Sequence, residues 1–200
     1  MGAVTPLGND VPTFWQGLRE GRCGIGPITH YDTSSQKVKL AGEVKDLPVA
    51  EYIDAKAAKR MDPFTQFAII AAKQAYQQAG LTPENVDAER FGVLISSGIG
   101  GLNTIETEMR RGLEKGFDRV SPFFVPMNIT NLAAGNVAIE LGAKGMCSCV
   151  VTACAGGTNA IGDAFRQIRD GYLDVIAAGG TESSITPLGV GGFTSMKALC

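Results

Sequence analysis

The sequence predicts an α/β fold with a mainly parallel sheet, and three short apolar segments carry that prediction. Residues 91–97 (FGVLISS), 146–151 (MCSCVV) and 173–178 (LDVIAA) have the length and apolar character of buried strands. Segments with the spacing of amphipathic helices lie between them. Strands that alternate with helices and are apolar on both faces indicate a parallel sheet that helices cover on both sides.

The composition excludes several classes of protein. Hydrophobic residues make up 44% of the 200 residues, enough for a core, and the formal net charge is -2. This charge argues against a generally basic nucleic-acid-binding protein. No apolar run has the length of a membrane span, and the N-terminus lacks a secretory signal. Five cysteines, an odd number, fit a reducing compartment, so we expect a cytoplasmic protein that binds neither nucleic acid nor membranes.

The first part of the chain contains two predicted helices. After an opening loop, residues 11–20 have helical spacing, and Phe14, Trp15 and Leu18 are expected to point inward. A weak strand is expected near residues 37–44. A long helix then starts at Asp62–Pro63, runs to Gln78 and ends at Gly80. Its apolar face is lined with small residues, which permits close packing: Phe64, Phe67, Ala68, Ala71, Ala72 and Ala75.

The middle of the chain follows the strand at 91–97. Gly98–Gly101 stops this strand, and a charged helix is expected over residues 102–116. Residues 121–127 (SPFFVPM) are predicted to form an ordered loop, because two prolines oppose regular structure and two phenylalanines need cover. Another helix is expected over residues 129–141.

Cys154 lies on a turn between the predicted strand 146–151 and a helix over residues 155–170. Unpaired amides and the helix dipole at such a position favour a thiolate, which is the nucleophilic form of cysteine. The small neighbours Ala153, Ala155, Gly156 and Gly157 would let a substrate carbonyl approach the sulfur. Position alone leaves two interpretations equally open, a nucleophile or a buried cysteine that only fills space.

Other candidate motifs are weaker. Gly98–Gly101 follows a strand as a phosphate loop would, but the spacing of phosphate-binding glycines is absent, and a tight turn beside a substrate channel is favoured. Cys147, Cys149 and Cys154 could bind a soft metal, yet two of them lie on a strand predicted to be buried, so structural thiols and no metal site are expected. His30, in a polar loop, is interpreted as a surface histidine.

Five segments of the sequence carry a resemblance to a known family: VTPLGND (4–10), SSGIGG (96–101), SPFFVPMNITN (121–131), VTACAGGTNAIGDA (151–164) and VIAAGGTESSITPLGVGGF (175–193). Together they resemble the β-ketoacyl-[acyl-carrier-protein] synthases, condensing enzymes of fatty-acid synthesis, and the type II synthases among them. The resemblance implies a thiolase-like fold, a layered αβαβα sandwich built from two similar halves. It also implies that Cys154 is the nucleophile.

The resemblance further implies how the site works. Cys154 would accept an acyl group from acyl carrier protein and pass it to a decarboxylated malonyl unit in a Claisen condensation. No cofactor is expected, because phosphopantetheine enters on the carrier protein as part of the substrate. A homodimer is also implied. The acyl pocket would include Gly98, Ile99, Phe193 and, across the dimer interface, Phe124; the carrier protein would dock on Lys56, Lys59, Arg60, Arg119 and Lys197.

Two departures from the family shape these expectations. Family members begin with a strand that precedes the first residues here, and they are about twice as long, with two histidines, a lysine and a GFGG turn in the second half. Residues 1–200 are therefore expected to be the N-terminal ketosynthase domain, truncated at both ends, and inactive in condensation by itself. Two alternatives remain open: a non-catalytic partner of the chain-length-factor type, and a thiolase acting on coenzyme A esters.

Overall fold

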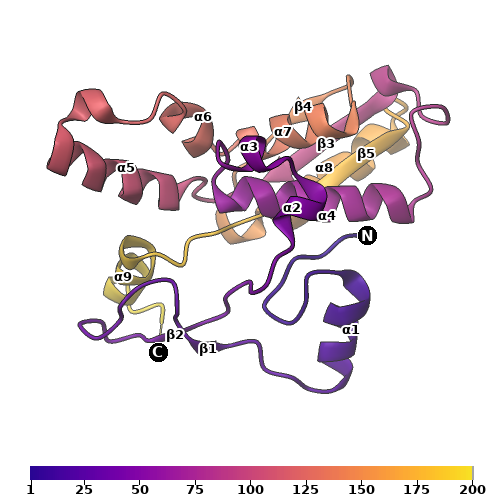
Figure 1. Cartoon of the computed structure of the whole chain (residues 1–200). Coiled ribbons are helices and arrows are strands. Elements are labelled where there is room, and N and C mark those ends of the chain that lie inside the picture. The colour runs from indigo at the N-terminus through magenta and orange to yellow at the C-terminus, as the bar shows by residue number, and fades with distance from the viewer. Residues whose placement is uncertain (200) are drawn as a thin grey trace.

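A three-stranded parallel sheet forms the centre of the fold in the computed structural model, which describes residues 1–199 (Figure 1). The order of the strands in space is β4-β3-β5, and both neighbours run parallel to β3. Val93 of the central strand lies opposite both Cys147 and Ala177. The prediction that these three segments form neighbouring strands of one parallel sheet is confirmed. The strands are β3 (Phe91–Ser96), β4 (Cys147–Ser148) and β5 (Val175–Gly180).

Helices cover both faces of this sheet, as the apolar strands predicted. They are α4 (Pro63–Gln78), α7 (Leu132–Leu141) and α8 (Gly156–Arg169). Val93 and Ile95 of β3 pack in the same core cluster as α4 and α7. Leu94 points to the other face and packs against Ala160 and Ala164 of α8. The sheet is therefore the middle layer of three, with all of β3 buried.

The long helix α4 begins and ends where the sequence predicts. Asp62 is its N-cap, and Gly80, at φ +66, follows its last turn. Asp62 is 1% exposed, and its Oδ2 accepts hydrogen bonds from the Thr104 amide (2.9 Å) and hydroxyl (2.8 Å). Burial raises the pKa of Asp62, although these hydrogen bonds act in the opposite direction. The buried carboxyl thus joins α4 to the start of α5 (Leu102–Lys115).

The other elements lie around this three-layer body. The helices are α1 (Val11–Arg19), α2 (Val49–Tyr52), α3 (Ala55–Ala58), α6 (Phe124–Asn128) and α9 (Pro187–Ser195), and β1 (Gly26–Pro27) pairs antiparallel with β2 (Leu40–Ala41). Three short 3-10 turns are η1 (Ala88–Arg90), η2 (Phe117–Arg119) and η3 (Ala153–Ala155). Figure 1 shows α5 and α6 projecting to one side, with α1, β1, β2 and α9 below the sheet.

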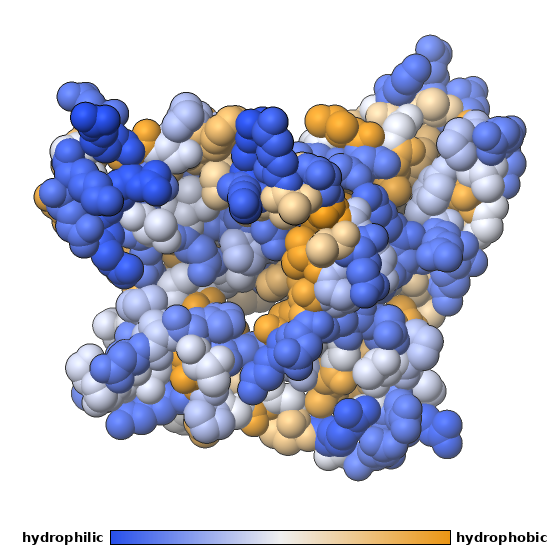
Figure 2. Space-filling view, in the orientation of Figure 1, coloured by the Kyte–Doolittle hydropathy of each residue, from blue (hydrophilic) through white to orange (hydrophobic). Residues whose placement is uncertain are grey.

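The surface is hollowed between these parts. Figure 2 shows a hollow between the lobe of α5 and the lobe of β2 and α9, with hydrophobic side chains along it among hydrophilic ones. Among residues 1–199, no helix is both long and apolar enough to cross a membrane.

Two predictions, for the segment 146–151 and for the helix over residues 11–20, need correction because both elements are more exposed than expected. The segment 146–151 forms only the two-residue strand β4, and both residues are exposed. β4 lies at the edge of the sheet, so β3 is its single neighbour and one side stays open. In α1, Trp15 (60% exposed) and Leu18 (47% exposed) do not point inward; the helix buries Gly17 instead.

The predicted loop at 121–127 is also wrong in part, because α6 occupies its second half. Pro126 is compatible with this short helix, since it lies in the first turn, where backbone amides have no acceptor within the helix. The sequence prediction counted prolines without considering their position in the turn.

Candidate active site

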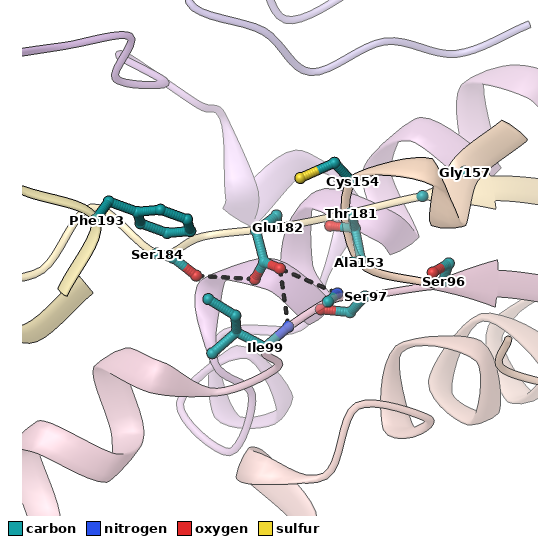
Figure 3. Close-up of a pocket in the computed structure, with 12 residues that line it drawn as sticks. Ser96, Ser97, Ile99, Ala153, Cys154, Gly157, Thr181, Glu182, Ser184 and Phe193 are labelled. Carbon is teal, nitrogen blue, oxygen red and sulfur yellow. Dashed lines mark hydrogen bonds between the residues drawn. The ribbon is translucent and has the colours of Figure 1, made fainter. Parts of the chain in front are cut away.

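A cavity of about 480 Å³ opens where the parallel strands end (Figure 3). The end of β3, the turn before α8 and the segment after β5 each contribute to its wall. β3 lies between β4 and β5. The chain passes from β3 to β4 through α7 on one face of the sheet, and from β4 to β5 through α8 on the other face. Open parallel sheets bind ligands at such a point, beyond the carboxyl ends of the strands. The cavity is therefore the candidate active site.

Cys154 lies in this cavity on a sharp turn. It belongs to η3, directly before α8, and its side chain is exposed. The preceding Ala153 has φ +49, a left-handed conformation that costs a residue with a Cβ about 1–2 kcal/mol. Cys154 thus lies directly before the N-terminus of α8, which is the positive end of the helix dipole. The exposed thiol excludes the interpretation of Cys154 as a buried cysteine.

The structure brings most of the predicted pocket residues to the same cavity. Gly98 and Ile99 line it from the turn after β3, and Phe193 lines it from α9. The Ile99 and Phe193 side chains are each 38% exposed. Phe124 lies in α6 and is not among the residues of 1–199 that line the cavity. The expected contribution of Phe124 across a dimer interface stays a prediction.

Glu182 is a cavity residue that the sequence analysis did not single out. It follows β5, and its Oε2 accepts hydrogen bonds from the amides of Gly98 and Ile99, both at 3.0 Å (Figure 3). Its Oε1 accepts a hydrogen bond from the Ser184 hydroxyl at 3.0 Å. The signal that could have found it is an acidic residue directly after an apolar strand, at the end where parallel sheets bind ligands.

The other candidates for chemistry do not form a site. Although Cys147 as a whole residue is exposed, partial desolvation of its sulfur raises the pKa of the thiol, and the nearby Cys149 adds to this shift. Within residues 1–199, no three His, Cys, Asp or Glu side chains are arranged to hold a metal ion. His30 is exposed, with its Nδ1 3.6 Å from the buried carboxylate of Glu43.

The predicted basic residues are exposed but spread over several elements. Lys56, Lys59 and Arg60 lie on and just after α3, and the Arg60 guanidinium stacks 4.5 Å from the centre of the Phe123 ring. This contact places the basic segment beside the start of α6. The two remaining residues are Arg119 in η2 and Lys197, which lines a second cavity together with Lys37.

Limited alkylation is expected to label Cys154 before Cys147 and Cys149. The thiolate is the reactive form. The Cys154 thiol is exposed in the cavity, whereas partial desolvation of the sulfur raises the pKa of Cys147 and disfavours its thiolate. Peptide mapping after brief treatment with iodoacetamide checks this order. Cys23 is the internal reference, since it is exposed but lies at no helix N-terminus. Earlier labelling of Cys147 or Cys149 than of Cys154 would contradict the assignment of the reactive thiol.

Comparison with known proteins agrees with this architecture. The family described as "Beta-ketoacyl synthase, N-terminal domain" matches residues 1–200. A 3-oxoacyl-[acyl-carrier-protein] synthase 2 of Synechocystis sp. is 52% identical over 199 residues, which are 100% of this chain and 48% of that protein. The enzyme of the same name from Staphylococcus aureus is 49% identical, again over 100% of this chain and 48% of the relative. The chain thus spans about half the length of these relatives.

Solved structures show the same fold. The ishigamide ketosynthase/chain length factor superposes with a TM-score of 0.92 at 26% identity, over 100% of this chain and 50% of that one. A type II polyketide ketosynthase, solved in complex with its acyl-carrier protein, gives a TM-score of 0.85 at 29% identity, over 99% of this chain and 48% of that one. The predicted thiolase-like fold is confirmed, and the three layers described above are its part in this chain. The chain belongs to the β-ketoacyl synthase family, whose N-terminal domain it carries.

Proposed function

We propose that this chain is the nucleophile-bearing half of a 3-oxoacyl-[acyl-carrier-protein] synthase. One observation carries the proposal: the exposed thiol of Cys154, at the start of α8, shares a cavity with the apolar side chains of Ile99 and Phe193. A nucleophile beside an apolar wall suits a thioester of a fatty acyl chain. Two relatives named 3-oxoacyl-[acyl-carrier-protein] synthase 2 support the same reaction class. They are 52% and 49% identical to this chain over its whole length.

The proposed reaction has two steps. The Cys154 thiolate attacks the acyl thioester carbon; a carbon–sulfur bond forms to Cys154, and the phosphopantetheine thiol leaves and takes up a proton. Malonyl-carrier protein then loses CO₂, and the resulting carbanion attacks the same carbon, which releases Cys154 as thiolate. The Cys154 amide, at the start of α8, would be one donor to the oxyanion. By resemblance, the histidines that stabilise the enolate belong to the second half of the family, and the reaction takes no cofactor.

Two alternatives are less well supported. A non-catalytic chain-length-factor partner shares the fold, and one structural neighbour is named a ketosynthase/chain length factor. However, such a partner needs no nucleophile, whereas Cys154 is exposed in the cavity. A thiolase would act on coenzyme A esters, but the relatives that are 52% and 49% identical to this chain have acyl carrier protein in their names.

An acyl-transfer experiment tests the proposed function. The chain, with and without the second half of the enzyme supplied, is incubated with an acyl-carrier protein thioester, and its peptides are mapped by mass spectrometry. We expect an acyl adduct on Cys154 when both halves are present. Absence of any adduct on Cys154 in the complete enzyme would exclude the proposal, and an adduct formed only from coenzyme A esters would favour a thiolase.

Exposed apolar surface suggests where the rest of the enzyme packs. Ile161 and Phe165, on the face of α8 away from the sheet, are 57% and 63% exposed, and Tyr172, just after the helix, is 69% exposed. In a five-layered sandwich this face would be covered by the second half. The open edge of β4 would pair with its copy in the proposed homodimer. Light scattering that shows a monomer for the complete enzyme would remove the dimer from the proposal.

Docking of acidic acyl carrier protein is proposed on the basic residues beside α3. In the complete enzyme, Lys59→Glu with Arg60→Glu is expected to raise the apparent KM for carrier-bound substrate about tenfold, because exposed charges at a rim steer the encounter. Steady-state kinetics at low and high salt measure the effect, which salt should weaken.

A small pantetheine thioester is the control substrate for this variant, because it does not use the docking surface. Its KM should change little. An equal loss on both substrates would show that the charges support the fold, and the docking surface would then be wrong. The exposed pair Arg19, at the end of α1, and Lys144, before β4, changed to glutamate in a matched variant, should leave the carrier-dependent KM much less affected.

A further inference from the structure

The backbone amides of the turn after β3 depend on a side chain from another segment. The first two, of Gly98 and Ile99, both donate to Oε2 of Glu182 at 3.0 Å. The next two donate to Ser97 Oγ and to the Asn128 carbonyl, each at 3.1 Å. Two successive amides that converge on one carboxylate oxygen form a small anion-binding arrangement. The half of the turn that carries Ile99 is therefore held from the segment after β5.

Glu182 is itself fixed at both ends. Its Oε1 accepts hydrogen bonds from Ser184 Oγ at 3.0 Å and from the Ser183 amide at 3.3 Å. The preceding Thr181 donates its amide to the Ser96 carbonyl at 2.9 Å and its hydroxyl to the Phe64 carbonyl at 2.6 Å. The carboxylate thus connects the ends of β3 and β5 and is not a freely moving surface charge.

The charged carboxylate of Glu182 is used for hydrogen bonding to the backbone and side chains around this cavity. Among the described residues that line the cavity, it is the one with a charged side chain. A carboxylate without partners beside an acyl chain would be unfavourable, but here four donors surround its two oxygens. Hydrogen bonds to a carboxylate are stronger than those between neutral groups, so they hold the turn firmly. No hydrogen bond in residues 1–199 joins Glu182 to Cys154, so it acts through the turn.

The turn after β3, which Glu182 holds, forms part of the cavity wall. Figure 3 shows the Ile99 side chain on the same side of the cavity as Phe193, while Cys154 reaches the cavity from the turn before α8. A change in the backbone at Ile99 moves this side chain relative to the sulfur. We propose that Glu182 is a positioning residue: it fixes Ile99 and thereby sets which lengths of acyl chain reach Cys154. This inference rests on the proposed function of Cys154 as the acyl acceptor.

The test compares two acyl lengths in the complete enzyme. Hexanoyl- and dodecanoyl-pantetheine are supplied separately, and the rate of Cys154 acylation is measured by mass spectrometry for wild type, Glu182→Ala and Glu182→Gln. Glu182→Ala is expected to change the ratio of the two rates by about fivefold toward less discrimination, since two charge-assisted hydrogen bonds to the turn are lost. Glu182→Gln keeps a carbonyl oxygen that can accept both amides and should restore the ratio to within about twofold.

A double-mutant cycle shows whether the effect passes through Ile99. In an Ile99→Ala background, Glu182→Ala should change the ratio no further. The matched control is Asp87→Ala, which removes a carboxylate that accepts the Glu89 amide (3.0 Å) at the other end of β3; its ratio should equal that of wild type.

Each outcome of these experiments supports or contradicts the positioning role of Glu182 or the proposed function. Equal loss of both rates in Glu182→Ala with no change in their ratio, or an additive cycle, would overturn the positioning role. If Glu182→Ala fails to fold, Glu182→Gln still decides: a folded variant with a ratio like that of wild type supports the role of the shared oxygen acceptor, and a ratio that differs strongly from wild type contradicts it. No acylation of Cys154 in wild type by either thioester would instead reject the proposed function.

Discussion

Replacing Cys154 with alanine in the complete enzyme is expected to lower acyl transfer and condensation by about 1,000-fold or more. The reason is that the covalent intermediate cannot form, and no other thiol among residues 1–199 lines the cavity. Single-turnover acylation followed by mass spectrometry measures the first step, and product formation from malonyl-carrier protein measures the second.

Cys147→Ala is the matched control for this loss. Cys147 lies on β4, outside the residues that line the cavity, so the change should leave acyl transfer nearly unaffected. Retention of more than a small part of the activity in Cys154→Ala, or a comparable loss in Cys147→Ala, would show that the nucleophile has been assigned to the wrong residue.

A second large effect is expected from Gly156→Ala, the first position of α8. A Cβ at this glycine would lie 1.9 Å from Oγ and 2.8 Å from Cβ of Ser96. Because both atoms lie in the buried central strand, which cannot move aside, the variant should lose about 2–4 kcal/mol in the free energy of unfolding. Urea unfolding of the 200-residue chain measures the change.

Ser96→Gly is expected to relieve this clash. The Ser96 hydroxyl is buried without a hydrogen-bond partner among the described residues, so removing it breaks no hydrogen bond seen there. A glycine in a strand costs about 0.5–1 kcal/mol, and the double variant should still be more stable than Gly156→Ala alone by about 1–2 kcal/mol.

The control for the clash is Gly162→Ala in the same helix. No atom lies within 4 Å of a Cβ placed there, so this change should be neutral or stabilising by up to about 1 kcal/mol. Simple additivity of the two changes at Ser96 and Gly156, or a similar loss in Gly162→Ala, would contradict the proposed contact between the nucleophile turn and β3.

Local signals in the sequence were sufficient for α4, for β3 and for the start of α8. Asp62–Pro63 and Gly80 define α4 correctly, because capping and proline preferences act within a few residues. The mostly apolar segment 91–97 predicts a buried strand, since a strand covered on both faces is apolar at successive positions. Cys154 was placed at a helix start by the same kind of local evidence.

Family resemblance supplied what local pattern could not. From position alone, Cys154 was equally well explained as a nucleophile or as a buried cysteine. Gly98, Ile99 and Phe193 were named for the pocket because of the resemblance, and the structure then placed them around the same cavity. Long-range proximity of this kind is not encoded in the spacing of any single segment.

The sequence by itself determined the three strands of the parallel sheet, the long helices between them and the position of Cys154 on a strand-to-helix turn. Only the tertiary structure decided which segments face each other. The exposed edge of β4, the outward position of Trp15 and the hydrogen bonds that the turn after β3 donates to Glu182 all depend on neighbours distant in the chain. The physical reason is that helix caps and strand propensity are local, whereas burial and side-chain hydrogen bonds are set by residues that meet only after folding.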